Sequence, residues 1–226
     1  ELTASLRETL KKTKSVDDAV LKVVREAFKE SAAVRFEGNN YSNDWVVEAA
    51  KRKLLNLRRA PEALAQLVTK DSRAVLTKLG ILSKPEIESR FHIRLERYVK
   101  DMLIEVHTLE ELIDTMVLPA AFQYLGMLTK SAADAKAAGI KTVPQLEAAN
   151  ELGAQIQELQ KRRAALGKVS AKAEGMHEEL EAQAKLLTAD GAARMADVRE
   201  SSDALELTVS DDLWPLPKYR EMLFPL

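Results

Sequence analysis

The sequence predicts an all-α protein: an elongated bundle of long antiparallel helices, preceded by short helices and a Gly-Asn-Asn turn. Three observations predict this fold. Apolar residues recur at steps of three and four along two long stretches, which keeps them on one helix face. Each stretch opens on a serine or threonine followed two residues later by proline, a helix-start pattern. The first stretch, roughly 55 residues or on the order of 80 Å as a helix, needs other long helices beside it.

The composition suits a soluble helical protein, with 46% apolar and 31% charged residues. Because 34 Lys and Arg nearly balance 35 Asp and Glu, we expect no nucleic-acid binding. The absence of cysteine excludes disulfides, thiolate metal sites and cysteine nucleophiles. We find no apolar run of membrane-spanning length and no signal-peptide pattern, so we expect a cytoplasmic protein without a membrane partner.

Two short helices are predicted at the start of the chain. Leu2, Leu6 and Leu10 lie about one helical turn apart and indicate a helix over residues 2–12. The Ser-Val-Asp-Asp capping pattern at residues 15–18 opens a second helix. Because residue 1 is not methionine and the helical stripe begins at once, we expect the chain to belong to a longer polypeptide.

A loop is predicted at Gly38-Asn39-Asn40, since these residue types best tolerate left-handed backbone. It lacks the glycine spacing and lysine of a phosphate-binding loop, so we interpret it as a structural turn. Ser42 then caps the next helix, and Pro61 suits the first turn of another. A further short helix over residues 71–79 ends at Gly80.

The first long helix is predicted from Ser83 to about Gly139. It opens with a capping box between Ser83 and Glu86. Pro119 removes one backbone hydrogen bond and should kink the helix, either as a fixed bend or as a working hinge. The apolar stripe consists of Ile87, Phe91, Leu95, Tyr98, Met102, Val106, Leu109, Ile113, Met116 and Ala120.

The second long helix is predicted from Pro144 to about Leu187. It should run antiparallel to the first because the connection between them is short. Gly153, Gly167 and Gly175 each weaken a helix interior, so we expect them to mark close helix contacts or local irregularity.

A last helix is predicted over residues 192–212, after a break at Asp190-Gly191. The Trp-Pro-Leu-Pro string at residues 214–217 ends it, because proline cannot continue a helix. The tail that follows is rich in aromatic residues and proline, and such an exposed patch is uncommon on a soluble monomer. We expect it to dock on the same chain or on a partner surface through Tyr219, Met222, Leu223 and Phe224.

The histidines offer one candidate metal site. Glu174 and His177 have the Glu-x-x-His spacing of di-iron helical bundles, but those sites need two such motifs and two more glutamates. A metal-dependent oxidase would rest on this pair alone, so we expect no metal there. His92 and His107 are interpreted as surface residues in polar contacts.

The basic clusters Arg58-Arg59 and Lys161-Arg162-Arg163 lack interleaved aromatic residues. Solvated faces or pairs between subunits explain them better than RNA contact. No serine–histidine–acid, paired-carboxylate or metal-ligand arrangement is found. The sequence therefore predicts no catalytic, cofactor-binding or metal-binding residue, and no activity for this chain alone.

Two strings resemble the C-terminal part of type III glutamine synthetases. One is Phe-Glu-Gly-Asn-Asn-Tyr-Ser-Asn-Asp-Trp-Val at residues 36–46, and the other is Leu-Trp-Pro-Leu-Pro-Lys-Tyr at residues 213–219. The resemblance spans nearly the whole chain, although residues 140–206 carry little of it. Shorter matches follow in the same order at residues 48–52, 55–57, 88–91, 95–98, 118–120 and 223–224.

The resemblance implies a part of an ATP-dependent ligase that joins ammonia to the γ-carboxyl of glutamate. Family members use Mg²⁺ or Mn²⁺ and are dodecamers, so the implied partners are the catalytic domain of the same chain and neighbouring subunits of a homo-oligomer. Residues 1–80 would end the catalytic domain, and residues 81–226 would form a helical extension for packing and assembly. The alternative is a free-standing helical scaffold or adaptor that binds a protein partner along the apolar stripe or through the tail.

Overall fold

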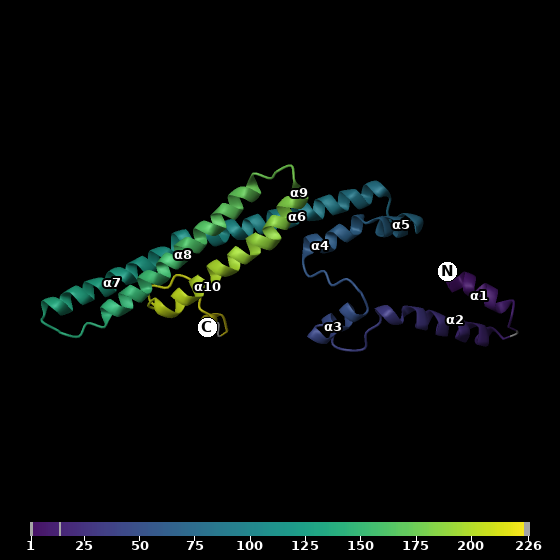
Figure 1. Ribbon diagram of the computed structural model, residues 1–226, viewed down its shortest axis with the longest axis horizontal. Helices are drawn as coiled ribbons and strands as arrows, with labels where there is room; N and C mark the ends of the chain where they lie inside the picture. The colour runs from purple at the N-terminus through teal and green to yellow at the C-terminus, as the bar shows by residue number, and fades with distance from the viewer. Residues whose placement is uncertain (1, 14, 224–226) are drawn as a thin grey trace. The chain divides into compact units, whose positions relative to one another are not determined.

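The computed structural model describes residues 2–13 and 15–223, with only the backbone of residues 219 and 220. Every regular element in these ranges is helical, which confirms the predicted all-α class (Figure 1). The chain divides into two compact units, Glu1–Arg58 and Arg59–Leu226, and each is described by itself. The predicted division at residue 80 concerns membership of a catalytic domain and stays a prediction.

The Glu1–Arg58 unit has short helices and little core. It contains α1 (Leu2–Leu10), α2 (Val16–Glu30), a 3₁₀ turn at Ser31–Val34 and α3 (Asn43–Lys51). Helix α2 begins as predicted, because the Ser15 hydroxyl accepts a hydrogen bond from the Asp18 N–H at 3.3 Å. Among the described residues of this unit, the buried side chains are Ala19, Val23 and Ala49.

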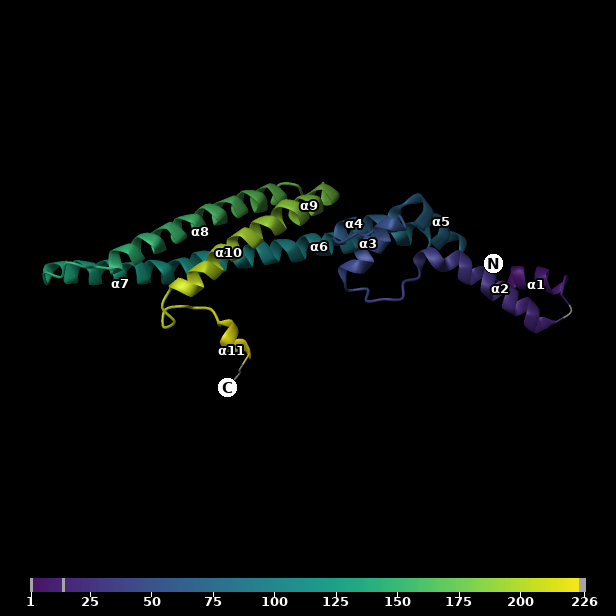
Figure 2. The same cartoon turned by 60° about the horizontal axis from the view of Figure 1, so that its bottom comes forward.

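The Arg59–Leu226 unit is a bundle of long helices preceded by short ones (Figure 2). Its main apolar cluster draws residues from α6, the π turn after α6, α7, α8, α10 and the chain beyond α10, and a second cluster joins α6 to α8, α9 and the π turn after α9. The helices are α4 (Ala60–Ala65), α5 (Lys70–Lys78), α6 (Lys84–Leu112), α7 (Leu118–Ala137), α8 (Gln145–Glu174), α9 (Leu180–Leu186), α10 (Ala192–Thr208) and α11 (Tyr219–Leu223), with a 3₁₀ turn at Gln66–Val68 and π turns at Ile113–Val117 and Leu187–Gly191.

The first long helix is confirmed as one continuous run, Lys84–Ala137, made of α6, a π turn and α7. Its N-terminal capping box is present, with the Ser83 N–H donating to Glu86 at 2.8 Å. The π turn Ile113–Val117 comes directly before the Leu118-Pro119 pair, and the Leu118 N–H bonds to the Ile113 carbonyl. A wider turn thus replaces the regular hydrogen-bond pattern where proline has no N–H to donate.

This run passes a membrane test based on length and average composition, although it contains no uninterrupted apolar run of membrane-spanning length. Among the described residues, Lys84–Ala137 has an 18-residue window with a mean hydropathy of 1.2, and 28% of that window is buried. The mean hydropathy of a window can be high even where polar residues interrupt the apolar run. Length and composition alone are weak support for a membrane span, and Val106, Ile113 and Val117 of this run lie in the main apolar cluster.

The second long helix is shorter than predicted. Helix α8 runs antiparallel to α7 as expected (Figure 1 and Figure 2) but ends at Glu174, and α9 begins only at Leu180. The prediction of a helix reaching Leu187 is therefore wrong. Gly175 supplies the physical reason, because glycine is a poor helix former and its N–H makes one of the last bonds of α8, to Ala171.

The predicted break at Asp190-Gly191 is also wrong, because a π turn, Leu187–Gly191, joins α9 to α10 without interruption. One local and two tertiary contacts hold this turn at Thr188. Its hydroxyl donates to the Ala184 carbonyl at 2.6 Å and lies 2.8 Å from the Tyr98 hydroxyl, while Arg59 donates to its carbonyl at 2.6 Å. Three side-chain contacts thus outweigh the local preference of Asp-Gly for a turn.

The two interior glycines of α8 lie in different surroundings. A Cβ at Gly153 meets nothing within 4 Å, so the expected close contact is not present there. A Cβ at Gly167 would lie 2.9 Å from an Arg163 nitrogen and 3.4 Å from a Glu110 oxygen. Gly167 therefore marks a close contact, as predicted.

Replacing Gly153 by alanine is expected to raise the free energy of unfolding by up to about 1 kcal/mol, because alanine is the better helix former. Gly167→Ala should lose that gain, since its methyl group displaces the Arg163 guanidinium. Urea unfolding followed by circular dichroism measures both changes. Equal stabilisation by the two substitutions would contradict the contact at Gly167.

Candidate functional site

The predicted metal motif does not form a site. Glu174 ends α8, whereas His177 lies in the non-helical turn before α9, so the two do not share a helix face. Instead, Glu174 lies 3.2 Å from the Nε2 of His107, which is the kind of surface polar contact expected for that histidine. His92 is exposed. Within residues 2–13 and 15–223, no group of three or more His, Asp or Glu side chains is placed to hold a metal ion.

The Gly-Asn-Asn segment is a turn closed by its own side chains. The Asn39 side chain accepts from the Tyr41 N–H at 2.9 Å, and the Ser42 hydroxyl donates to the Asn39 carbonyl at 2.8 Å. Gly38 packs under the Phe36 ring, where a Cβ would lie 2.6 Å from a ring carbon. The structural interpretation of this loop is therefore supported, and it leaves the Tyr41 side chain fully exposed.

Arg52 is a positioning residue that the sequence analysis missed. Its Nε pairs with Glu48 at 2.8 Å, and its Nη1 donates to the backbone carbonyls of Ala32 and Arg35. The hydrogen bond from Arg52 holds the pKa of the Glu48 carboxyl below its ordinary value of 4.5. The i,i+4 spacing of Glu48 and Arg52 could have indicated the ion pair, but only the fold brings the two carbonyls to Arg52.

The basic clusters make contacts inside the Arg59–Leu226 unit. Arg59 donates to the Thr188 carbonyl, so it is not only a solvated residue as predicted. Arg163 contacts the Asp114 carboxylate through Nε at 3.1 Å and Nη2 at 2.6 Å, and Glu110 through Nη1 at 3.0 Å. Both arginines therefore contact residues of their own unit. The sequence alone could not identify these partners.

The neighbouring Arg162 makes its contacts on another side of α8, where α10 lies. It pairs with Glu158 at 2.8 Å and Glu200 at 2.6 Å, and donates to the Asp197 carbonyl at 2.8 Å. The hydrogen bond from Arg162 lowers the pKa of the Glu158 carboxyl. Arg162 and Arg163 together therefore tie α8 to α10 on one side and to α6 and its π turn on the other.

The tail docks only in part. Trp214 is 8% exposed and belongs to the main apolar cluster, with Leu213 and Leu216 packed against that cluster. The side chains of Met222 and Leu223 are exposed in this chain, so their docking on a partner surface stays a prediction. The Tyr219 side chain and Phe224 lie outside the described residues. The local sequence could not show that the tryptophan would be buried and the residues beyond it exposed.

A groove lies beside Trp214. Its volume is about 630 Å³, and it combines apolar walls with a charged rim from α10. The Trp214 indole N–H is buried and has no hydrogen-bond partner among the described residues. The side chains that line it most directly include Leu109, Met195, Leu216 and Met222.

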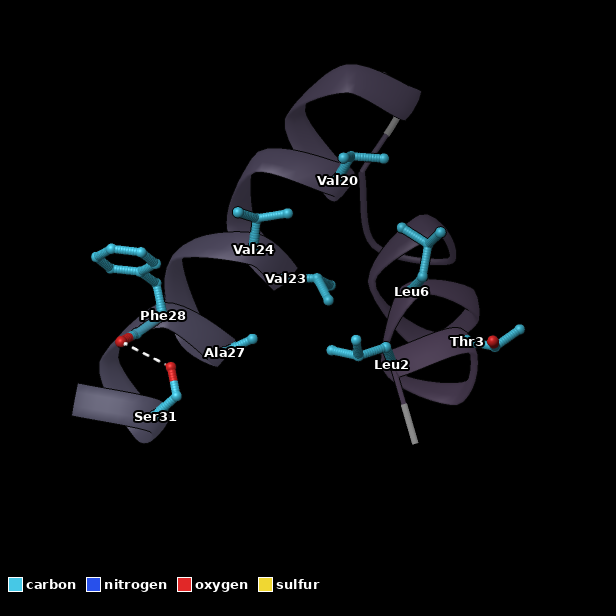
Figure 3. A pocket seen from close by; sticks show the side chains of 9 residues that line it. All are labelled: Leu2, Thr3, Leu6, Val20, Val23, Val24, Ala27, Phe28 and Ser31. Atoms are coloured by element: carbon cyan, nitrogen blue, oxygen red, sulfur yellow. Dashed lines mark hydrogen bonds between the residues drawn. The ribbon is translucent and has the colours of Figure 1, made fainter. Parts of the chain in front are cut away.

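A second groove lies between α1 and α2 of the Glu1–Arg58 unit, and is here called the α1–α2 groove (Figure 3). It has a volume of about 440 Å³ and is almost wholly apolar. Figure 3 shows Leu2 of α1 directed toward Val23 and Ala27 of α2. The lining residues are Leu2, Thr3, Leu6, Val20, Val23, Val24, Ala27, Phe28 and Ser31.

Comparison with known proteins identifies the family. The sequence model of the glutamine synthetase C-terminal domain matches residues 19–136, more than half of this chain. The chain belongs to the glutamine synthetase C-terminal domain family. This result confirms the resemblance carried by residues 36–46, which lie inside the matched range.

Curated glutamine synthetases are among the relatives of this chain. The chain is 30% identical over 231 residues to glutamine synthetase of Bacteroides fragilis (strain YCH46), and the alignment covers 99% of this chain and 31% of the relative. It is 33% identical over 211 residues to glutamine synthetase of Butyrivibrio fibrisolvens, covering 92% of this chain and 30% of the relative. Type-3 glutamine synthetase of Dictyostelium discoideum is 30% identical over 219 residues, with 94% and 30% covered. The chain therefore spans about a third of the length of these relatives.

Proposed function

We propose that this chain is the helical, non-catalytic C-terminal part of a type III glutamine synthetase, and that it serves packing and oligomer assembly. The observation that carries this proposal is the match of nearly the whole chain to about a third of each curated relative, one of them named a type-3 enzyme. The complete polypeptide would make glutamine from glutamate and ammonia with ATP. We further propose that it acts in the cytoplasm.

ATP and Mg²⁺ or Mn²⁺ would be held by the remainder of that polypeptide. The donor set of this chain does not fit a metal, because the described residues offer no cluster of three or more His, Asp or Glu side chains. We therefore assign no metal contact to the described residues, and the prediction of no catalytic or nucleotide contact in this chain stays a prediction. Its proposed partners are the catalytic domain of the same polypeptide and neighbouring subunits of a homo-oligomer, which we expect to be a dodecamer.

The alternative of a free-standing scaffold has less support. Binding along the stripe of α6 and α7 would require that stripe to be open to a partner, but Ile87, Leu95 and Val106 on it are almost completely buried within the Arg59–Leu226 unit. The buried stripe residues offer little apolar area to a second protein, whereas Met222 and Leu223 are exposed and leave binding through the tail open.

The first test recovers the natural polypeptide with an antibody against residues 213–223 and measures its intact mass and its glutamine synthesis. A product about three times heavier than this 25.1 kDa chain that makes glutamine is expected. A product of 25.1 kDa without that activity would overturn the proposal.

The assembly role has a separate test. Truncating the natural polypeptide before Ser83 should reduce the particle size or the stability of the assembly, measured by light scattering and thermal unfolding. Particles of full size and unchanged stability would contradict a role in assembly while leaving the family membership intact.

A further inference from the structure

We propose that the α1–α2 groove is an interface filled by the polypeptide that precedes this domain in a longer glutamine synthetase chain. This inference rests on the proposed function and names the surface through which the domain packs on the remainder of its own chain. Four features support it: the apolar walls of the groove, the small core around it, the contacts that order the end of α2 beside it and the length of the relatives.

The groove is apolar and large enough for several side chains. Leu2 and Leu6 of α1 line it together with Val20, Val23, Val24, Ala27 and Phe28 of α2. Figure 3 shows Leu2 directed toward the Val23 and Ala27 side of α2. Its volume of about 440 Å³ is nearly three times the ~150 Å³ of an engineered cavity that holds benzene. Several of its lining side chains, including Leu2, Val24 and Phe28, are more than half exposed.

The Glu1–Arg58 unit lacks the core that would stabilise it alone. Its buried side chains among the described residues are Ala19, Val23 and Ala49, and both larger apolar clusters of the protein belong to the other unit. Units of this size bury little surface and are marginally stable without further support. Covering the groove would therefore bury apolar surface that the unit by itself leaves exposed.

The C-terminal end of α2, beside the groove, is held by two arginines. The Arg35 guanidinium lies 3.3 Å from the centroid of the Phe28 ring and donates to the Phe28 carbonyl. Arg52 in turn holds the carbonyls of Ala32 and Arg35. Because these contacts order the end of α2 before any partner binds, less entropy is lost on docking.

The occupant follows from the comparisons. The chain matches a C-terminal domain and covers only 30–31% of the length of its relatives, so most of each relative lies outside the match. A segment joined to α1 would meet the groove at an effective concentration in the millimolar range. A second copy of this chain has no such tether, so the preceding segment is the favoured occupant.

Thiol labelling tests the proposal, because these 226 residues contain no cysteine. Val24→Cys places a thiol in the groove, and Leu21→Cys is the matched control. Val24 is 54% and Leu21 is 52% exposed, both lie on α2, and Leu21 does not line the groove. The rate of maleimide labelling at each site is measured by peptide mass mapping in the 226-residue chain and in the natural polypeptide.

We expect the Val24→Cys thiol to react at least tenfold more slowly in the natural polypeptide than in the 226-residue chain, with no change for Leu21→Cys. Equal rates for Val24→Cys in a longer, glutamine-synthesising polypeptide would overturn the groove assignment but not the proposed function. Slower labelling of both thiols would overturn the assignment to the groove. Protection that appears in the 226-residue chain and grows with its concentration would identify a second copy instead. A natural polypeptide of 25.1 kDa would overturn both proposals.

Discussion

Replacing Trp214 by alanine is expected to lower the free energy of unfolding by about 3–5 kcal/mol, the usual cost of removing a buried tryptophan. Trp214 is 8% exposed and packs in the cluster that also holds residues of α7, α8 and α10. Its removal takes apolar contacts from several helices at once and leaves a cavity beside an existing groove. Urea unfolding followed by circular dichroism measures the change.

Trp214→Phe is the informative control, because the indole N–H has no partner among the described residues. Phenylalanine keeps much of the apolar contact and removes a buried donor that costs about 1–3 kcal/mol when unpaired. We therefore expect Trp214→Phe to cost much less than Trp214→Ala. A loss as large as that of alanine would show that the indole N–H makes a needed hydrogen bond.

The second large effect is expected at Arg163, where replacement by alanine should lower the free energy of unfolding by about 2–3 kcal/mol. The Arg163 and Glu110 side chains are largely buried, so removing the cation leaves a carboxylate of α6 without its partner. The expected cost is below that of a fully buried pair because Asp114 is exposed and water screens it. Fluorescence of Trp214 in a Trp45→Phe background reports the unfolding of this bundle, since the chain has two tryptophans.

Lys161→Ala provides the control on the same helix. Lys161 is exposed and pairs with Glu158 at 3.7 Å, so its removal should change the free energy of unfolding by less than about 0.5 kcal/mol. Similar effects of Lys161→Ala and Arg163→Ala would mean that the contacts of Arg163 are no stronger than those of a surface pair.

These expectations describe how the bundle is built around α8. Arg162 and Arg163 are adjacent in sequence, yet one pairs with Glu200 of α10 and the other with Asp114 of the π turn. Gly167 leaves space for the Arg163 side chain one turn later. A short basic cluster, which by its composition indicated a solvated face, thus joins the neighbours of α8 on both sides.

The sequence predicted the helical class and the first long helix because both depend on local order along the chain. The capping box at Ser83 and the regular apolar stripe specify a helix wherever the chain lies. The turn at Gly38-Asn39-Asn40 was predicted for the same reason, since Asn39 closes it through bonds to near neighbours. The family resemblance was also carried by short local strings.

The sequence could not predict features that depend on residues far apart. Asp190-Gly191 indicated a break, but Arg59 and Tyr98 hold Thr188 and keep α9 joined to α10. The Glu174–His177 spacing indicated a shared face only if the helix continued past Gly175, and it does not. The first outcome was decided by contacts between distant residues, whereas the second was decided locally by Gly175, whose effect the apolar period does not record.

By itself, the sequence determined the helical class of this protein and where the first long helix begins, because caps, proline and apolar period act within a few residues. Only the tertiary structure decided which charged side chains pair between helices, which tail residue is buried in the apolar cluster and which apolar face stays uncovered. Arg163, Trp214 and the α1–α2 groove differ from similar residues nearby only in what the fold brings beside them. Those properties arise from burial and from contacts between distant segments.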